Sequence, residues 1–294
     1  MKRVLISGAN SGIGRSTALH LAQAGYDVWA GMRDLAKARK LLDHAVAAGT
    51  DKRVRPVVLD VCSTESVRAA VARIEAEDGP IDVLVNNAGI ALNAVVEDVD
   101  IVQAQAVFDA NYWGALRCIQ AVLPGMRERQ GGMIVNVSSV TGRIAALAQV
   151  IYASSKWALE CLSENLAQEM APFGVRVKII EPGVTRTALL AKHGGHPTPT
   201  AYADAYRRMF QFYATGIAAN QTGDDVALVI REAIEDESPR LRYPCSFGAL
   251  EICGRRPQVS DADWIALGAC LSDEEYQARF KELFGIDLSP DRVG

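Results

Sequence analysis

The sequence predicts an α/β fold in which a parallel, doubly wound sheet of about seven strands is flanked by helices. Short apolar runs alternate with longer segments of helical periodicity along most of the 294 residues. Glycine-rich or polar turns separate these segments. No internal repeat or low-complexity linker interrupts the alternation, which is typical of parallel strands joined by helical crossovers.

The expected strands are short apolar runs at residues 4–7, 26–32, 54–59, 81–85, 133–137, 175–180 and 241–243. Helical patterns lie between them, at residues 13–24, 35–47, 64–78, 98–129, 150–173 and 222–237. Ligands of such folds bind at the carboxyl ends of the strands. The side chains that follow each run are therefore the first candidates for a site.

The composition is that of an ordinary globular protein, with 49% hydrophobic and 22% charged residues. The net charge of −4 and the scattered basic residues give no reason to expect nucleic acid or an anionic membrane as a partner. No apolar run approaches the roughly 18 residues of a membrane span, and the N-terminus lacks a signal-peptide core. Six cysteines lie far apart without a Cys-x-x-Cys pair, which favours free thiols in a reducing cytoplasm.

One close histidine pair, His193 and His196, has a spacing that metal ligands also use. It lies in a loop rich in Gly and Pro, without a third ligand nearby. We therefore expect no metal site.

A glycine-rich GxxxGxG turn joins the first expected strand to the first helix. Strand, glycine turn and helix form the context in which such a motif binds phosphate. Glycines let the backbone approach a pyrophosphate, which lies at the positive end of the helix. The alternative is a turn required only for packing. The candidate cofactor ligands in this turn are Gly8, Asn10, Ser11, Gly12, Ile13 and Gly14.

The end of the second expected strand is where an adenosine ribose is usually recognised. An acidic side chain there would accept hydrogen bonds from a 2′-hydroxyl, whereas an arginine would pair with a 2′-phosphate. Met32 occupies the place of the acid and Arg33 follows it, which favours NADP(H) over NAD(H). Alternatively, Arg33 is simply solvated and Asp34 caps the next helix.

Two further strand ends carry small or polar residues. Asp60, which precedes Val61, is placed to accept a hydrogen bond from an adenine amino group; alternatively it caps the next helix, although Ser63 is the better placed cap. The fourth strand ends in the sequence Asn-Asn-Ala-Gly, a small and polar edge that a cofactor ribose can approach. The candidates at this edge are Asn87, Ala88 and Gly89.

The main candidate for chemistry is the step from Tyr152 to Lys156 at the start of a helix. A spacing of four residues places the two side chains on one helical face. An ammonium there favours phenolate and lowers a pKa that is ordinarily about 10, so the tyrosine can exchange a proton with an alcohol or carbonyl. Ser139, just after the fifth strand, can hydrogen-bond the same substrate oxygen. The spacing alone also fits an exposed pair on a helix, and the neighbouring motifs decide between the two interpretations.

The helical segment 98–129 is interrupted near Asn111 and Gly114. A polar side chain and a glycine within a helix cost stability unless something uses them. Asn111 is either a satisfied core amide or the mark of a local kink whose freed carbonyl holds a water.

The segment 188–222 mixes Gly, Pro and Thr with several aromatic side chains and lies outside the sheet pattern. We interpret it as a lid over an apolar pocket. The tail, residues 245–294, has an apolar pattern of its own. We expect it to be a helical extension that packs on the catalytic domain, residues 1–244.

Together these motifs resemble those of short-chain dehydrogenases/reductases of the single-domain branch, over roughly residues 3–244. Residues 7–14 resemble the family's TGxxxGxG, with Ser7 in place of the usual threonine, and residues 86–89 match its NNAG. The residues that match its catalytic tetrad are Asn111, Ser139, Tyr152 and Lys156. The segment that carries its PG step and its nicotinamide-side threonine supplies Pro182, Gly183, Val184 and Thr187.

The resemblance implies a Rossmann-type fold and hydride transfer between a nicotinamide and a carbonyl/alcohol pair. Tyr152 would be the general acid in reduction and the general base in oxidation. Lys156 would hold the ribose hydroxyls and lower the pKa of the tyrosine. Ser139 would polarise the substrate oxygen, and Asn111 would hold a water that relays protons.

The resemblance also implies a cofactor, a substrate class and an assembly. In the family, a pair like Met32 and Arg33 goes with NADP(H), although Ser11 stands where a second basic residue often joins it. The lid and tail are similar to those of members that act on hydroxysteroids and retinoids, and an apolar wall selects apolar substrates. A homodimer or homotetramer is expected through the helices at 99–129 and 150–173.

Three functional hypotheses follow. The first is an NADP(H)-dependent carbonyl reductase or alcohol dehydrogenase for a bulky apolar substrate, such as a steroid, a retinoid or an aryl compound. The second keeps this chemistry but uses NAD(H) on a small or polar alcohol. The third is a sensor or scaffold that binds NADPH without turnover, and the complete tetrad argues against it because a pure binder has no use for a phenol above an ammonium.

Overall fold

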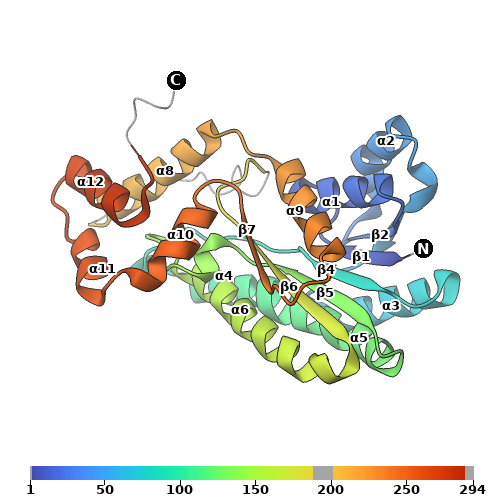
Figure 1. Cartoon of the computed structure of the whole chain (residues 1–294). Helices are drawn as coiled ribbons and strands as arrows, with labels where there is room; N and C mark the ends of the chain where they lie inside the picture. Colours follow the sequence, from blue (N-terminus) through green and yellow to red (C-terminus); the bar gives the residue numbers. More distant parts are fainter. Residues whose placement is uncertain (1, 188–200, 289–294) are drawn as a thin grey trace.

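The computed structural model of the chain describes residues 2–187 and 201–288 and has the α/β architecture that the sequence predicts (Figure 1). Seven strands within these ranges form one parallel sheet in the order β3-β2-β1-β4-β5-β6-β7. The strands are β1 Arg3–Ser7, β2 Asp27–Met32, β3 Val54–Val58, β4 Val83–Asn86, β5 Gly132–Val137, β6 Val175–Pro182 and β7 Arg242–Cys245. The order reverses between β1 and β4, and ligands of doubly wound sheets bind in the crevice at such a reversal.

Helices cover both faces of the sheet (Figure 1). On one face lie α1 Gly12–Gln23, α2 Arg39–Ala47 and α9 Gly223–Glu235. On the other lie α3 Thr64–Asp78, α5 Gly114–Glu128 and α6 Val150–Met170. The helix α4 Ile101–Phe108 continues into α5 through a π-helical turn, Asp109–Trp113. A further group at one end of the molecule comprises α8 Ala203–Ala218, α10 Ala249–Arg255, α11 Asp261–Gly268 and α12 Asp273–Phe284.

The hydrophobic core lies on both faces of the sheet. Along β1, Val4 and Ile6 pack with side chains of α1 and α9, whereas Leu5 packs with side chains of α3 and α5. This alternation is the two-residue period of a strand. Because both faces are covered by helices, the strands read as nearly continuous apolar runs in the sequence.

Two predicted helices differ from the structure in detail. The helix expected over 35–47 begins as a 3-10 turn, Leu35–Ala38, and the Asp34 carboxylate caps this turn by accepting a hydrogen bond from the backbone N–H of Ala36 at 2.9 Å. The capping role considered for Asp34 is thus confirmed. The segment expected over 98–129 is one helical run with the π-helical turn at Asn111, so the predicted interruption is confirmed as a change of helical pitch.

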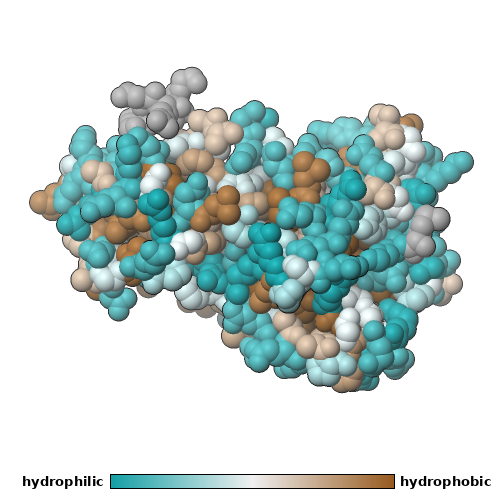
Figure 2. Space-filling view, in the orientation of Figure 1, coloured by the Kyte–Doolittle hydropathy of each residue, from teal (hydrophilic) through white to brown (hydrophobic). Residues whose placement is uncertain are grey.

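The C-terminal helices share an apolar cluster with the segment that follows β5. Phe280 of α12 packs with Ile252 of α10 and with Val140 and Ile144 after β5. Its ring also lies 5.9 Å from that of Phe212 on α8, centroid to centroid. On the face shown in Figure 2, apolar side chains appear among the hydrophilic ones of these helices. These contacts place the C-terminal helices against the segment that follows β5.

Part of the expected lid, residues 188–200 with His193 and His196, lies outside the described residues. Within the described ranges, no group of three or more His, Cys, Asp or Glu side chains is arranged to hold a metal ion. Among the helices of those ranges, none combines the length and the apolar character that crossing a membrane demands.

Candidate active site

The carboxyl ends of β1, β4, β5 and β6 bring most of the sequence-predicted residues to one edge of the sheet. Tyr152 and Lys156 lie in the first two turns of α6, and Ser139 follows β5. Asn111 lies in the π-helical turn that packs against α6. The four residues of the expected tetrad therefore come from neighbouring elements.

Tyr152 and Lys156 lie on one face of α6, as their spacing predicts. The Lys156 Nζ atom is 5.7 Å from the centroid of the Tyr152 ring. It donates a hydrogen bond to the Val137 carbonyl oxygen at 2.9 Å, and the lysine is 4% exposed. The ammonium is thus held between the end of β5 and the phenol, and the alternative of an exposed surface pair is excluded.

The pKa of each of these two groups is shifted by burial. Burial raises the pKa of Tyr152 to about 12, and a hydrogen bond with Ser139 acts in the opposite direction. Burial lowers the pKa of Lys156 to about 8, and the nearby Glu160 carboxylate opposes that shift. The expected lowering of the Tyr152 pKa is wrong for this structure, because loss of solvation is the largest effect on it. A phenol that keeps its proton near neutral pH suits the role of an acid.

Ser139 is anchored at the point where β5 ends. Its hydroxyl donates a hydrogen bond to the Pro182 carbonyl oxygen at 3.4 Å and accepts one from the Thr141 N–H at 3.2 Å. The serine is 7% exposed. Because it is also a hydrogen-bonding neighbour of Tyr152, two hydroxyl groups converge on one point at this edge.

Asn111 joins the π-helical turn to α6. Its Oδ1 accepts a hydrogen bond from the Ile90 N–H at 2.8 Å, and its Nδ2 donates to the Ile90 carbonyl at 2.9 Å and to Ser155 Oγ at 3.0 Å. Ser155 Oγ in turn donates to the Tyr152 carbonyl at 2.7 Å. Both interpretations of Asn111 therefore hold in part, since its amide is satisfied and it lies in a distorted helix. Ser155 was not predicted, because a serine in a helix carries no signal of its own.

The glycine turn after β1 has the close approaches that its sequence predicts. Gly8 and Gly12 have φ values of 69° and 52°, which other residues rarely adopt. A Cβ atom on Gly14 would lie 2.4 Å from Asn87 Nδ2 and 2.5 Å from the Gly8 carbonyl oxygen. A Cβ atom on Gly12 would lie 3.4 Å from Thr187 Cβ, so the turn lies beside the segment after β6. This is a cradle of bare backbone at the N-terminus of α1.

The end of β4 is tied to the end of β1. Ser7 Oγ accepts hydrogen bonds from the N–H groups of Asn87 and Ala88, each at 3.0 Å. Asn87 Nδ2 donates to the Ser7 carbonyl at 3.0 Å. A Cβ atom on Gly89 would lie 3.1 Å from Asn111 Oδ1 and 3.8 Å from Lys156 Nζ. The predicted Asn87–Gly89 edge therefore connects the glycine turn with Asn111 and Lys156 of the candidate tetrad.

The residues predicted to bind the adenosine part of the cofactor lie at the ends of β2 and β3. Met32 is buried in the core and Arg33 is exposed, so the guanidinium is the side chain available at this edge. Asp60 accepts a hydrogen bond from the Cys62 N–H at 3.1 Å, and Ser63 caps α3, as the sequence suggested. Val61 is buried, 8% exposed, and because its side chain is apolar only its backbone groups could bind a cofactor.

The segment after β6 packs tightly against the C-terminal part of the chain. The N–H groups of Gly183 and Val184 donate to the carbonyls of Cys245 and Phe247, at 2.8 and 3.1 Å. A Cβ atom on Gly183 would lie 1.9 Å from the Phe247 carbonyl oxygen. Glycine is therefore required here by a close approach of two backbone segments.

We expect Gly183→Ala to destabilise the fold, because the methyl group can be accommodated only if backbone moves. Overpacking of this kind costs about 1–3 kcal/mol. Thermal unfolding measures the effect as a lower Tm. The control is Gly254→Ala, whose added methyl group would meet no atom within 4 Å, and which lies in α10, where alanine favours the helix. An unchanged Tm for the Gly183 variant would contradict the prediction.

A cavity of about 850 Å³ lies beside the start of α6. Its wall is largely apolar and is formed by the segment after β5, by α8 and by the C-terminal helices. Representative lining residues are Ile144, Leu147, Ala153, Met209, Phe212 and Leu267. Gln149, the N-cap of α6, and Ala153 also line it, so the cavity adjoins the first turn of the helix that carries Tyr152, although Tyr152 is not itself one of its lining residues. The described part of the expected lid contains α8, which contributes Met209 and Phe212 to the wall of this cavity, and its role as a lid stays a prediction.

Two polar side chains at this cavity were not predicted. Gln149 Nε2 donates a hydrogen bond to the Tyr213 hydroxyl, and that hydroxyl is 3.5 Å from Asn93 Oδ1. The ionised form of Tyr152 would also raise the pKa of Tyr213, so the two phenols are close. The sequence showed only that the lid segment is rich in aromatic residues. That content predicts packing, but it does not predict that Tyr213 would hydrogen-bond with Gln149.

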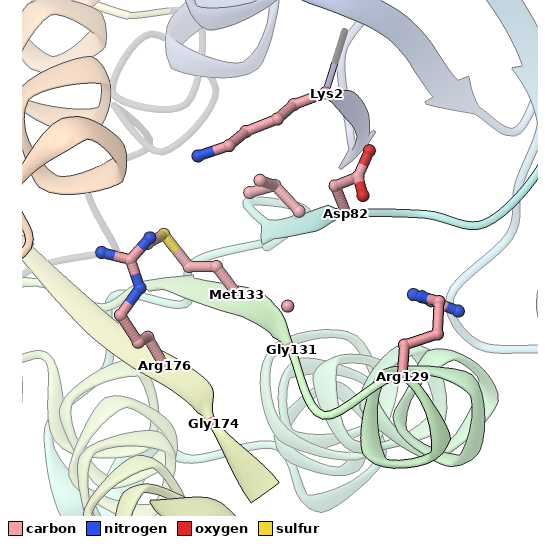
Figure 3. A pocket seen from close by; sticks show the side chains of 9 residues that line it. Lys2, Asp82, Arg129, Gly131, Met133, Gly174 and Arg176 are labelled. Atoms are coloured by element: carbon pink, nitrogen blue, oxygen red, sulfur yellow. The ribbon is translucent and has the colours of Figure 1, made fainter.

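A second hollow, of about 460 Å³, lies at the opposite edge of the sheet, where β4 and β5 begin. Figure 3 shows the side chains of Lys2, Asp82, Arg129 and Arg176 around it. None of the predicted site residues lines this hollow. The candidate catalytic residues do not line the cavity beside α6 either, but that cavity adjoins their helix, because Ala153 and Ser154 line it and follow Tyr152 in the chain.

Comparisons with known proteins agree with this geometry. The sequence matches the profile of the short chain dehydrogenase family over residues 2–196. It is 36% identical to human retinol dehydrogenase 8, over 82% of this chain and 80% of the relative, and 35% identical to human 17-beta-hydroxysteroid dehydrogenase type 1, over 82% and 76%. The crystal structure of a short-chain dehydrogenase from Streptomyces avermitilis superposes with a TM-score of 0.78 at 31% identity, and covers 92% of this chain and 99% of that chain.

Proposed function

We propose that this chain, which belongs to the short-chain dehydrogenase/reductase family, transfers a hydride between NADP(H) and the carbonyl or secondary alcohol of a bulky apolar substrate. One observation carries the proposal. The phenol of Tyr152 is hydrogen-bonded with Ser139 and placed near the Lys156 ammonium, on a helix whose first two turns also contribute other residues to the wall of a large apolar cavity.

The chemistry follows from the positions of three side chains. The nicotinamide supplies or accepts the hydride when it is bound. Ser139 donates a hydrogen bond to the substrate carbonyl and so fixes it beside the phenol. Tyr152 donates its proton to the oxygen as negative charge develops there, and its raised pKa keeps that proton in place until then. Lys156, held by the Val137 carbonyl, keeps a positive charge beneath the phenol and stabilises the phenolate that proton transfer leaves.

The backbone cradle fits a dinucleotide. Gly8, Gly12 and Gly14 remove side chains at the N-terminus of α1, where N–H groups and the helix dipole favour a pyrophosphate. The site residues proposed with them are Asn10, Ser11, Ile13, Asp60, Val61, Asn87, Ala88, Gly89, Pro182, Gly183, Val184 and Thr187. The preference for NADP(H) rests on the exposed guanidinium of Arg33, which can pair with a 2′-phosphate.

The substrate class rests on the cavity. Its volume of about 850 Å³ suits a ligand of several rings or a long apolar chain, and its lining offers few polar groups. The names of the relatives point the same way, since one acts on retinol and the other on hydroxysteroids. A small polar alcohol would leave most of this apolar wall in contact with water.

The assembly and location are also proposals. Exposed apolar side chains on α4, the π-helical turn and α6 form a surface for a second copy of the chain: Ile101, Val102, Trp113 and Trp157. Their exposure is typical of an interface in a homodimer or homotetramer. The free thiols of the six cysteines suit a reducing compartment such as the cytoplasm.

The experiment that tests the proposal is NADPH oxidation with a panel of carbonyl compounds. Steroid, retinoid and aryl carbonyls are compared with small aliphatic ones, and NADH is run in parallel. We expect turnover with at least one bulky apolar compound and a preference for NADPH. Turnover confined to small polar compounds with NADH would support the second hypothesis, and tight NADPH binding without any turnover would support a sensor.

A further inference from the structure

Two buried carboxyl groups lie directly behind the catalytic residues. Glu160 on α6 is 5% exposed and Glu181 near the end of β6 is 1% exposed. One oxygen of each, Oε1, accepts no hydrogen bond within the described residues, although Glu181 Oε1 lies within ion-pair distance of two arginines. Buried carboxyl groups are rarely retained unless something uses them, because removing a charge from water is costly.

One guanidinium lies between the two carboxyl groups. Arg242 Nε on β7 is 3.0 Å from Glu160 Oε2 and 3.3 Å from Glu181 Oε1. The same arginine also pairs with the exposed Glu164, and Arg143 lies 3.9 Å from Glu181 Oε1. A single shared N–H cannot fully compensate two buried negative charges, so the pair favours a state in which one carboxyl group keeps its proton.

Each carboxyl group is connected with a different catalytic side chain. Glu160 follows Lys156 by four residues, one turn along α6, and its carboxylate opposes the loss of charge from that lysine. Glu181 precedes Pro182, whose carbonyl accepts the hydrogen bond from Ser139. A Cβ atom on Gly142 would lie 2.7 Å from Ser138 Oγ, 3.0 Å from Glu160 Cγ and 3.3 Å from the Lys156 carbonyl, so the turn after Ser139 rests on the same cluster.

The groups that surround the pair set its charge. Burial, together with the neighbouring Glu160, raises the pKa of Glu181 to about 7, against the opposing effects of Arg143, Arg242 and a hydrogen bond with Cys253 of α10. Burial also raises the pKa of Glu160, against the effects of Ser138, Arg242 and Arg143. Glu181 also acts on the Cys245 thiol of β7, whose pKa is raised mainly by burial, so that this thiol stays neutral.

We propose that Glu160 and Glu181 are positioning residues, which share one proton on the acidic side of neutrality and act through Arg242 to keep Lys156 charged and Ser139 in place. The proposal rests on the proposed function for its catalytic consequence. When Glu181 loses its proton, it attracts the Arg242 guanidinium more strongly. The guanidinium then neutralises less of the negative charge of Glu160, and Glu160 stabilises the Lys156 ammonium more. The Lys156 ammonium is therefore stabilised most at alkaline pH, where this lysine would otherwise lose its proton.

The activity test compares Glu181→Gln and Glu160→Gln with the wild type across the pH range. Glu181→Gln mimics the protonated acid, so its kcat/KM should match the wild type near about pH 6 and fall about threefold to tenfold below it near about pH 8.5. Glu160→Gln should show the larger loss at alkaline pH. A merely structural role would lower activity by a similar factor at every pH.

A stability measurement tests the shared proton without any turnover. The pKa of Glu181 is raised from 4.5 to about 7 in the folded chain, so the folded state binds a proton that the unfolded state has lost. Its contribution to stability is full below about pH 4.5 and is lost as the pH rises through about 7. We therefore expect the Tm of the wild type to fall relative to that of Glu181→Gln over this interval.

The matched control is Glu164→Gln, which removes an exposed partner of the same Arg242. Its activity and Tm should run parallel to the wild type at all pH values. Parallel profiles for Glu181→Gln as well, in Tm or in kcat/KM, would overturn the proposal. If no substrate is turned over, the proposed function fails, and the Tm profiles still decide whether the buried pair holds its proton.

Discussion

Replacing Tyr152 by phenylalanine should lower kcat/KM for carbonyl reduction by about 10²- to 10⁴-fold, the range typical of a positioned proton donor. The phenylalanine ring keeps the packing of α6 and the contact with Lys156, but it cannot donate a proton to the substrate oxygen. The loss should appear in kcat, because the hydroxyl acts as charge develops in the transition state. The affinity for NADPH, measured by fluorescence titration, should change little.

The matched control for this variant is Tyr26→Phe. Tyr26 precedes β2 at the opposite edge of the sheet, so removing its hydroxyl should leave the kinetics unchanged. A Tyr152→Phe enzyme that retains wild-type kcat would contradict the assignment of the proton donor, whatever the effect on stability.

Replacing Arg33 by aspartate should lower kcat/KM with NADPH by about 10²-fold, and it should leave kcat/KM with NADH unchanged or raise it. A charge-assisted hydrogen bond to a phosphate is worth about 1.5–3 kcal/mol, and the new carboxylate adds repulsion. With NADH, the same carboxylate can accept hydrogen bonds from the ribose hydroxyls. Steady-state kinetics with both cofactors measure the exchange of preference.

The control is Arg127→Asp, which makes the same change of charge at an exposed position near the end of α5. It separates local pairing with the cofactor from a general loss of positive charge. An Arg33 variant whose ratio of NADPH to NADH activity equals that of the wild type would exclude the ribose-phosphate contact.

The fold and the tetrad could be predicted because local sequence carries them. Continuous apolar runs and glycine turns reflect strands that are buried on both faces, and the four-residue step from Tyr152 to Lys156 reflects a helix period. The interruption at Asn111 was also readable, because a polar residue beside a glycine is unusual within a helix. Each of these features depends on residues that are close in the chain.

Other features depend on contacts between residues that are distant in the chain, and they could not be predicted from the sequence. The contact of Glu181 with Arg242 joins two strands, and that of Gln149 with Tyr213 joins the catalytic helix to the lid. The direction of the Tyr152 pKa shift was predicted wrongly for a related reason. The four-residue spacing shows that a lysine lies near Tyr152. The pKa shift is dominated by burial, and the extent of burial depends on the packing of the whole site.

The central claim is that the chain transfers a hydride to an apolar carbonyl compound at the phenol of Tyr152. The most direct measurement uses NADPH deuterated at the transferable position of the nicotinamide, with the best substrate of the carbonyl panel. Mass spectrometry and NMR of the product then locate the label. We predict one deuterium on the carbinol carbon with the wild type and almost none with Tyr152→Phe in the same time. Oxidation of the cofactor without deuterium on that carbon would contradict the account.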